Sequence, residues 1–422
     1  MTEVFRYTPL KVAIEALSRE VAYKPESEYV KVRDSYERVL ASDLLATDDL
    51  PRRATAHFDG FALSSADTAT ATKESPAVLA VSDDETRVGV VPKKALRLGG
   101  ASKVATGGYL PTGADAVVAI EDVSTRGKRL YVPHPVAPGE HVYPKGADVR
   151  RGERVLSAGR TLMGQDLVLM TSLRCSKVAV FKKPRVGIIP TGSELTPRIE
   201  NPPKGRVVES HSLLLARLAE EAGGLATTMP IVRDERRALT RAIREAFRGN
   251  DVVFTLAGSS VGEPDLVSSA IESLGSATLL VHGVRIHRGR VMGVAVVSGK
   301  PLVIHPGPIQ GALNAFILFG YPLIRHHLGK GFEQPPSISL TTGGSWEATG
   351  RFKDFDQVVY LKLIRDSAAS GGFVAIPSSA ETEKASFLTS RNAYALLRGE
   401  NARLEKGQFV DAHLLPGFSR LE

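Results

Sequence analysis

The chain contains one cysteine in 422 residues, Cys175. A single cysteine excludes a disulfide framework and a cysteine-based metal site within one chain. It also fits a reducing compartment. No motif surrounds Cys175, which lies between Arg174 and Ser176. We therefore interpret it as a small, half-buried structural residue and not as a nucleophile.

Long apolar runs are also missing. No segment approaches the roughly 18 uncharged apolar residues that a membrane-spanning helix requires. The first six residues, M-T-E-V-F-R, lack the basic-then-apolar order of a signal peptide. We therefore expect a cytoplasmic protein with no membrane partner.

Aromatic residues make up only 6% of the chain, whereas the formal net charge is +8. Because basic and aromatic residues do not alternate to form a stacking platform, we do not expect a nucleic-acid partner. A positive surface favours anionic partners such as phosphate-bearing molecules and oxyanions. The same charge can equally serve solubility alone.

The length and the 43% hydrophobic content predict roughly three domains of about 150 residues each. A first helix is predicted from the apolar spacing of Leu10, Leu17 and Val21, with Thr8 as its cap and Pro9 in its first turn. A second, short helix is predicted near residues 35–45.

Short apolar runs separated by glycine and proline predict two β-rich regions. The first region extends from about residue 47 to residue 145 and the second follows residue 329. The predicted strands are Ala77–Val81, Ala116–Ile120, Leu130–Val132, Val358–Leu363, Phe373–Ile376, Ala393–Leu397 and Phe409–Leu415.

Repeated strand-loop-helix units between these regions predict a doubly wound α/β domain, with a parallel sheet and helices on both faces. The expected strands are Val186–Ile189, Met229–Val232, Asp251–Leu256 and Leu302–His305. The expected helices cover Ser210–Ala222, a segment ending at Phe247, a segment starting at Pro264 and a long segment ending near Leu328. In the first of these helices, Leu213, Leu214 and Leu218 are expected to face inward.

Four loops are expected at the carboxyl edge of this sheet, where open α/β sheets bind ligands. They are Thr191–Glu194, Arg233-Asp234, 258–265 and Pro306-Gly307-Pro308. Their glycines allow a ligand to approach the backbone, and the N–H groups of the following helices favour an anion. Turn chemistry alone explains one such loop, but four at one edge favour a phosphate or oxyanion site.

Glu194, Asp234 and Asp265 belong to the same edge. Carboxylates beside an anion site suggest a Mg²⁺ ion, which prefers oxygen ligands and bridges to phosphate. Alternatively, Glu194 and Asp234 cap the helices that follow them. His282, His287 and His305 lack a zinc-binding motif and are interpreted as structural or solvated, whereas His57 is a candidate in an exposed loop.

Several segments match, in order, the motifs of one family, and the chain resembles the molybdopterin molybdenumtransferase family (the MoeA and gephyrin E-domain type). Residues 105–118 carry the most specific match, A-T-G-G-Y-L-P-T-G-A-D-A-V-V against the family's T-G-A-P-L-P-x-G-A-D-A-V-V. Further matches are D-L-P at 49–51, F-D-G-F-A-L at 58–63, G-A-D-V at 146–149, T-G-S-E-L at 191–195, A-G-S-S-V-G at 257–262 followed by Asp265, P-G at 306–307 and L-E-K-G at 404–407.

The resemblance implies an elongated, multidomain α/β plus β subunit that forms a homodimer. A first domain would be built from two segments, 1–46 and 146–178, with a β-rich insert domain at 47–145. A MogA-like α/β domain would follow at 179–329, and a small, barrel-like β domain at 330–422.

The resemblance also implies a reaction. Molybdate or tungstate would be inserted into adenylylated molybdopterin (molybdopterin-AMP), with release of AMP and with Mg²⁺ assisting. An upstream adenylyltransferase would supply the substrate, and molybdoenzymes would be the clients.

The family's functional acids map onto Asp59, Asp148, Glu194, Asp234 and Asp265, of which the last three would hold the metal. Asp59 and Asp148 would reach the α/β domain of the partner subunit. The expected substrate-binding residues are Thr191, Gly192, Gly258, Ser259, Ser260, Gly262, Arg288, Arg290, Pro306 and Gly307.

Departures from the family pattern fall on the loops that contact anions. Both lysines of the family's I-K-P-G-K-P loop are replaced, by His287 and Arg290. Three positions of P-G-N-P-V-S-A are Pro308, Ile309 and Gly311, which removes an amide and a hydroxyl. The aspartate of T-G-D-E-L is Ser193, and the asparagine and serine of N-S-A-M-D are Thr55 and Ala56.

Two accounts of these departures are compatible with the sequence. Either the enzyme is active and rebuilds its anion pocket with Arg288 and Arg290, since arginine can bind an oxyanion with two donors. Or the chain is a catalytically diverged paralog that binds a pterin or nucleotide, or serves as a scaffold. Retention of all five acids favours activity.

Overall fold

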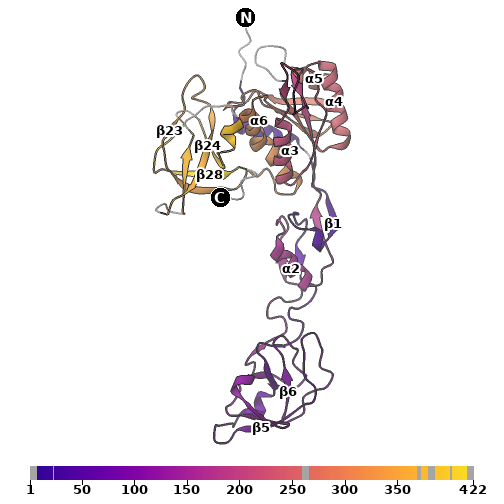
Figure 1. The fold of residues 1–422 in the computed structure, drawn as a ribbon. Helices are drawn as coiled ribbons and strands as arrows, with labels where there is room; N and C mark the ends of the chain where they lie inside the picture. The colour runs from indigo at the N-terminus through magenta and orange to yellow at the C-terminus, as the bar shows by residue number, and fades with distance from the viewer. Residues whose placement is uncertain are drawn as a thin grey trace. The chain divides into compact units, whose positions relative to one another are not determined.

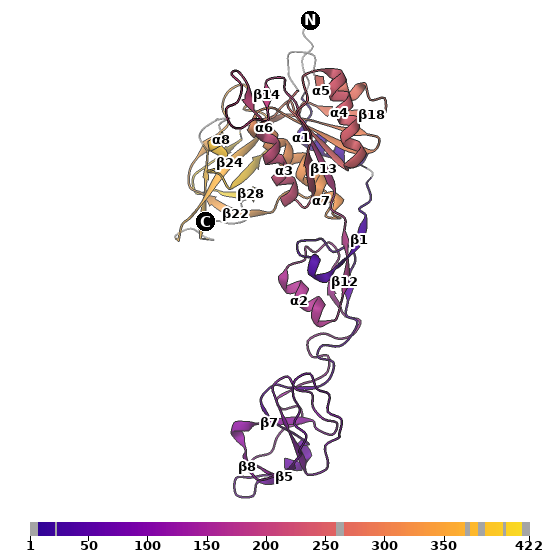
Figure 2. The ribbon, with the colours of Figure 1, turned by 45° about the vertical axis from the view of Figure 1, so that its right-hand side comes forward.

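A computed structural model describes residues 7–21, 23–258, 266–367, 372–378, 385–399 and 402–415 (Figures 1 and 2). The chain forms two compact units, one of residues 29–180 and one of residues 1–28 with 181–422. Strand β1 (Ser27–Lys31) pairs with β12 (Lys177–Phe181) where the chain passes between the units.

The unit of residues 29–180 is built mainly from short strands. A six-stranded sheet has the order β7-β4-β6-β5-β9-β8, and its core contains Phe61, Leu79 and Leu130. The strands predicted at 77–81, 116–120 and 130–132 are therefore confirmed. The bounds are β2 Leu44–Leu45, β3 Thr55–Ala56, β4 Gly60–Leu63, β5 Ala77–Val81, β6 Gly100–Val104, β7 Ala116–Ala119, β8 Ser124–Arg126, β9 Arg129–Val132, β10 Val142–Tyr143, β11 Arg154–Leu156, α2 Gly164–Ser172, and the 3₁₀ turns η1 Val32–Asp34, η2 Ser65–Thr68 and η3 Ile120–Asp122.

The helix predicted near residues 35–45 is wrong. Ser35 ends the turn η1, where its hydroxyl donates to the carbonyl of Val32 at 2.7 Å. Val39 and Leu40 are both buried, and they form isolated bridges to Thr161 and Val180. Pairing with these distant segments supplies hydrogen-bond partners for the backbone N–H and C=O groups here. This outweighs the local helix propensity.

The second unit contains a six-stranded sheet with the order β16-β13-β17-β21-β20-β18. The first four strands are parallel, as expected, but β20 runs antiparallel to both β21 and β18. The sheet is therefore mixed, because the short turn after β20 returns the chain as a hairpin instead of through a helix. The bounds are β13 Arg185–Pro190, β14 Leu195–Thr196, β15 Val207–Val208, β16 Leu225–Thr228, β17 Val252–Leu256, β18 Ala277–His282, β19 Ile286–His287, β20 Gly293–Val297 and β21 Lys300–His305.

Helices cover both faces of this sheet, as predicted. Figure 1 shows α4 and α5 on one side and α3 and α6 on the other. Side chains of α4 and α5 such as Ile243 and Val267 pack on Val253 and Ile304 of the sheet. The bounds are α1 Leu10–Glu20, α3 His211–Glu221, α4 Arg236–Gly249, α5 Leu266–Glu272, α6 Ile309–Ala315, the π-helical turn η4 Phe316–Gly320, and α7 Tyr321–His327.

Three local predictions in this unit are wrong. Leu213 of α3 is 61% exposed, and Leu215 is buried in its place. The strand expected at 229–232 lies earlier, at β16, because the backbone of Leu225–Thr228 pairs with β13. Thr8 does not cap α1 with its side chain; its backbone forms a bridge to Val284 instead.

The C-terminal strands form a closed barrel. Strand β24 pairs with both β25 and β26, and the order β24-β25-β22-β28-β26 returns to β24. Leu340, Leu361 and Val410 lie in its core. The bounds are β22 Ser337–Thr342, β23 Trp346–Glu347, β24 Asp356–Arg365, β25 Phe373–Pro377, α8 Ala385–Leu388, β26 Ala393–Leu397, β27 Arg403–Leu404 and β28 Phe409–Leu414. This confirms the expected β domain and its four predicted strands.

Across the described ranges, no helix has both the length and the apolar character needed to span a bilayer.

Two histidines of this unit are buried and neutral. Burial lowers the pKa of His305, at the end of β21, to about 4, and also lowers that of His327, at the end of α7, to about 4. The Nε2 atom of each has no hydrogen-bond partner. His305 packs on Phe254, and His327 stacks on Tyr23 with ring centres 3.9 Å apart.

These histidines predict a loss of stability in acid. Above pH 6.5 both are neutral in either state and contribute no pH dependence. Between pH 6.5 and pH 4 the unfolded chain takes up protons that the folded chain cannot, so each histidine lowers the free energy of unfolding by about 1.4 kcal/mol per pH unit. In His305→Leu, the decrease between pH 7 and pH 5 should be smaller by about 2 kcal/mol than in the unsubstituted protein. Urea unfolding at both pH values measures this, and equal decreases in the two proteins would contradict it.

Candidate functional site

Three parallel strands end at the same level of the sheet. Pro190 of β13 is the register partner of Leu256 of β17, which in turn is the partner of His305 of β21. The loops that follow therefore leave the sheet side by side. The strand register thus brings together Thr191-Gly192, Ala257-Gly258 and Pro306-Gly307, as the sequence predicted.

The loop after β13 is tied to its neighbours by backbone and side-chain bonds. Thr191 donates its N–H to the carbonyl of Leu256 at 2.9 Å, and Gly192 donates to Val232 at 3.0 Å. Ser193 and Asp234 bond reciprocally: the N–H of Ser193 donates to Oδ2 of Asp234 at 2.7 Å, and the N–H of Asp234 donates to Oγ of Ser193 at 3.0 Å. These bonds hold Asp234 against the 191–194 loop.

The helix-capping alternative for the two acids is wrong. No side chain caps α4, which begins after Asp234, and Glu194 is followed by the short strand β14. The Glu194 carboxylate folds back over Gly192, 2.9 Å from the position of a hypothetical Cβ on that residue. Any side chain at residue 192 would displace it.

The loop after β17 turns through two left-handed residues, Ala257 (φ +69°) and Gly258 (φ +77°). A Cβ on Gly258 would lie 3.3 Å from the side chain of Thr191, so this turn packs directly on the neighbouring loop. Left-handed backbone is costly for alanine, which stands here where the family pattern has glycine. The expected residues Ser259, Ser260, Gly262 and Asp265 lie outside the described part of the chain.

The 286–291 loop, which carries the substituted lysine positions, reaches the same edge. A Cβ on Gly311, in the first turn of α6, would lie 2.9 Å from Cβ of Pro306 and 3.3 Å from Cα of Gly289. The backbone of the loop and that of α6 are thus in direct contact beside Pro306-Gly307. Arg288 and Arg290 flank this contact.

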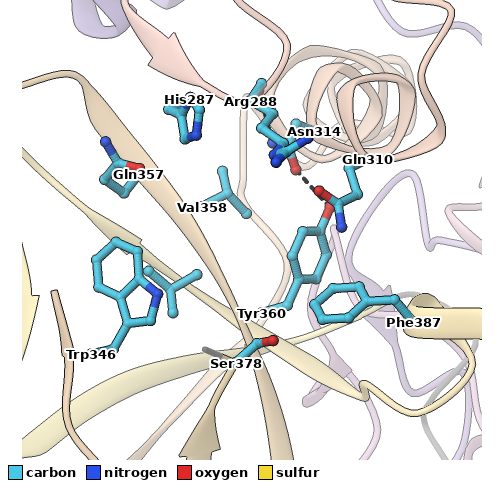
Figure 3. Close-up of a pocket in the computed structure, with 11 residues that line it drawn as sticks. His287, Arg288, Gln310, Asn314, Trp346, Gln357, Val358, Tyr360, Ser378 and Phe387 are labelled. Atoms are coloured by element: carbon cyan, nitrogen blue, oxygen red, sulfur yellow. Dashed lines mark hydrogen bonds between the residues drawn. The ribbon is translucent and has the colours of Figure 1, made fainter. Parts of the chain in front are cut away.

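A cleft of about 420 Å³, including its open mouth, lies between this loop, α6 and the barrel (Figure 3). Its described lining is His287, Arg288, Gln310, Asn314, Trp346, Gln357, Val358, Val359, Tyr360, Ser378 and Phe387. The lining combines flat aromatic rings with amides and one arginine, a set that suits an anionic ligand with a planar polar ring.

Asn314, in α6, connects the 286–291 loop, α6 and the barrel, the three segments that line this cleft. Its Oδ1 accepts the hydroxyl of Tyr360 at 2.7 Å, the bond drawn in Figure 3, and its Nδ2 donates to the carbonyl of Arg288 at 2.9 Å. Burial raises the pKa of Tyr360, so its hydroxyl remains a proton donor. Asn314 is buried, and its bonds therefore fix the position of Arg288 in the loop.

The side chains at the substituted lysine positions stack on one ring of the barrel. The His287 ring lies 5.9 Å from the Phe352 ring at an interplanar angle of 25°, and the guanidinium carbon of Arg290 lies 4.7 Å from the centre of the same ring. The sequence analysis missed Phe352, Asn314 and Tyr360. The pairing of β19 with β24, which are distant in the sequence, and the Asn314 bonds bring the barrel to this loop.

Asp59 and Asp148 belong to the unit of residues 29–180, whereas the carboxyl edge belongs to the other unit. Oδ1 of Asp59 accepts the N–H and the hydroxyl of Thr106 at 2.7 and 2.8 Å, and these bonds lower the pKa of the carboxyl. Asp59 therefore fixes the turn of the most specific motif. Asp148 is exposed.

His57 is exposed as expected, and it belongs to an aromatic cluster beside Asp59. Its ring lies 4.6 Å from that of Phe58 and 4.5 Å from that of Tyr143. Phe58 also contacts His141 edge-on at 4.7 Å.

Two family profiles match the chain. The MoeA N-terminal region (domain I and II) matches residues 8–173, and the probable molybdopterin binding domain matches residues 187–326. A molybdopterin molybdenumtransferase of Nostoc sp. is 31% identical over 313 residues, which cover 73% of this chain and 71% of the relative. The chain belongs to the MoeA family of molybdopterin molybdenumtransferases.

Further MoeA relatives match along nearly the full length. A molybdopterin molybdenumtransferase of Staphylococcus aureus is 27% identical and covers 96% of this chain, with 94% of its own length matched. The crystal structure of a molybdopterin biosynthesis MoeA protein from Pyrococcus horikosii matches with a TM-score of 0.84 at 27% identity, over 97% of this chain and 99% of that one. The expected fold class, α/β plus β with a MogA-like domain, is confirmed.

One departure from the MoeA pattern has a packing explanation. Gly311 stands where the family motif has serine, and it lies between Pro306 and Gly289 with no room for a side chain.

Cys175 also fits its structural interpretation, because it packs on the buried core near α2 and burial raises the pKa of its thiol.

Restoring the serine should destabilise this chain. Gly311→Ser forces the backbones of α6 and the 286–291 loop apart, which should cost about 1–3 kcal/mol of folding free energy. Gly249→Ser is the matched control, since a Cβ on Gly249 of α4 has no atom within 4 Å. Thermal unfolding compares the two variants. Equal melting temperatures would show that the loop has room for a hydroxyl.

Proposed function

We propose that this chain inserts molybdate or tungstate into molybdopterin-AMP and releases AMP. The observation that carries the proposal is the common register of β13, β17 and β21, which aligns three glycine-containing loops at one edge. Membership of the MoeA family supports the same reaction. The substrate would come from an upstream adenylyltransferase, and a cytoplasmic location fits the single cysteine.

In this proposal, the carboxyl edge binds the anionic parts of the substrate. The N–H group of Gly307 and the hydroxyl of Thr191 bind phosphate and oxyanion oxygens, and Gly192, Gly258, Ser259, Ser260, Gly262 and Pro306 are assigned to the same binding site. Arg288 and Arg290 neutralise the second anion, since a guanidinium can bind an oxyanion with two donors. Holding two anions at one edge aligns them for the transfer.

Mg²⁺ is also part of the proposal, with Glu194, Asp234 and Asp265 as its ligands. Within the described ranges, no three acidic, histidine or cysteine side chains come together as a metal site. The described residues therefore do not form a magnesium site by themselves, and we assign no step to the ion.

AMP release is the direct test. Purified protein is incubated with molybdopterin-AMP and Mg²⁺, with and without molybdate or tungstate, and AMP is quantified. We expect oxyanion-dependent release that EDTA suppresses. Asp265→Asn should lower the rate by about 100-fold or more, the usual effect of removing a charged catalytic group. Asp83→Asn, which alters an exposed acid paired with Lys128 in the other unit, is the control and should change little.

Tight binding of molybdopterin-AMP without release of AMP would contradict the transferase proposal. The chain would then be a diverged paralog that binds the pterin nucleotide or serves as a scaffold.

We also propose that the working site needs a homodimer, with Asp59 and Asp148 supplied by the partner subunit. The variants Asp59→Asn and Asp234→Asn should each be inactive alone. Asparagine keeps the Oδ1 acceptor for Thr106, so the first variant should fold. Mixed and reassembled dimers should recover about a quarter of the wild-type rate per chain, since half of the dimers are mixed and each contains one intact site. Unmixed variants run in parallel serve as the control, and no recovery in the mixture would contradict a shared site.

A further inference from the structure

Helix α4 concentrates positive charge on its exposed side. Its 14 residues include five arginines, no lysine and a single acid, Glu245. The helix therefore has a net charge of +4, which is half of the formal net charge of +8 of the whole chain. The function proposed above uses none of these side chains.

Four of the arginines form a straight row, which we call the arginine row. They recur at intervals of four, three and four residues, which places them on one face of the helix. At about 1.5 Å of rise per residue, the row extends over about 16 Å. The opposite face of α4, with Leu239 and Ile243, is buried against the sheet. The members of the row, all exposed, are Arg237, Arg241, Arg244 and Arg248.

The arginine row is unfavourable for the chain by itself. Successive members are three or four residues apart, where like charges on a helix repel one another. Arg237 also lies in the first turn, at the positive end of the helix dipole. In the described ranges no carboxylate comes within 4.0 Å of these guanidinium groups, and Glu245 does not pair with Arg241 four residues before it. An anionic partner from outside the chain would relieve this repulsion.

The row lies apart from the candidate cleft. Helices α4 and α6 cover opposite faces of the sheet (Figure 1), and the cleft is lined by α6. The first residue of α4, Arg236, comes two residues after Asp234, which is bonded to the 191–194 loop. A partner bound along the row would therefore lie beside the carboxyl edge without occupying the cleft.

We infer that the arginine row is a docking site for another protein, through a helix that carries a matching row of carboxylates. The inference goes beyond the proposed function and does not depend on the reaction. Arginine is enriched at protein interfaces, where lysine is depleted, and a guanidinium binds a carboxylate with two parallel donors. A helix with acids at the same intervals repeats the spacing of the row, so four ion pairs can form together.

Other polyanions fit the row less well. A helix that binds an anionic membrane inserts its apolar face, but the apolar face of α4 is packed on the sheet. Single-stranded nucleic acid is held by aromatic rings on which its bases stack. The one aromatic side chain of α4, Phe247, packs against the core instead.

Fluorescence anisotropy of a labelled, alanine-based helical peptide tests the inference on the full-length protein at physiological ionic strength. The matched peptide has glutamates at the intervals of the row, and a scattered peptide of the same composition has them around the whole helix. We expect the matched peptide to bind more tightly. The combined variant Arg237→Gln, Arg241→Gln, Arg244→Gln and Arg248→Gln should weaken its binding about thirtyfold, the joint effect of four exposed ion pairs.

Replacement of the same four arginines by lysine keeps the charge. It should weaken binding of the matched peptide about threefold, because the paired donors of the guanidinium are lost. Both variants should fold, since the substitutions are at exposed positions and the glutamine variant removes repulsion within the helix. Thermal unfolding measures this, and neither melting temperature should fall.

The matched protein control removes four positive charges from the barrel and should leave affinity within about twofold, because distant exposed charges are screened by salt. Its substitutions, all at exposed positions, are Lys362→Gln, Arg365→Gln, Arg403→Gln and Lys406→Gln. A loss of affinity equal to that of the glutamine variant of α4 would show that only net charge matters, and it would overturn the inference.

Three further results would also overturn it. The first is equal binding of the matched and scattered peptides, or no binding of either. The second is binding of duplex DNA or of phosphatidylserine vesicles through the row without binding of the matched peptide, which would assign the row to nucleic acid or to a membrane. The third is a smaller assembly of the glutamine variant in light scattering, which would make the row an interface between copies of this chain.

Discussion

The buried carboxamide of Asn314 is the interaction on which the candidate site depends. It accepts from Tyr360 of the barrel and donates to the carbonyl of Arg288, while its own helix α6 begins directly after Pro306-Gly307. One side chain therefore ties the barrel, the cationic loop and the glycine-containing edge together. Because a buried amide with an unmet bond is costly, these three segments have one favourable arrangement. The close contact of Gly311 with Gly289 and Pro306 fixes the same arrangement by shape.

This arrangement changes how the departures from the MoeA pattern are understood. Considered one at a time, the replaced lysines and the missing serine suggest that the anion site has lost binding groups. In the fold, Gly311 is required by close packing, Ser193 bonds reciprocally with Asp234, and Arg290 stacks on a ring of the barrel. The substituted positions thus have definite structural partners, and they are compatible with a site that has been rebuilt.

The residues of the proposed site fall in both compact units. The edge loops and the cationic loop belong to the unit that contains the α/β sheet, whereas Asp59, with the aromatic cluster of His57, belongs to the unit of residues 29–180. Asp59 fixes a turn through Thr106 and its carboxyl has a lowered pKa, so it carries a charge in a defined place.

The sequence alone determined the family, the order of folded regions, ten of the eleven strands predicted from it and the four edge loops, because these follow from local periodicity, turn residues and motif order. It failed where distant backbone pairing outweighs local pattern, as at residues 35–45, and where burial depends on which neighbour covers a face, as at Leu213. Phe352, Asn314 and Tyr360 could not be found from the sequence. Phe352 and Tyr360 belong to the C-terminal strands, far from Arg290 in the sequence, and it is the packing of the barrel on the α/β sheet, including the pairing of β19 with β24, that places a ring under Arg290. Local spacing determines elements, but contacts between distant segments are decided by how those elements pack.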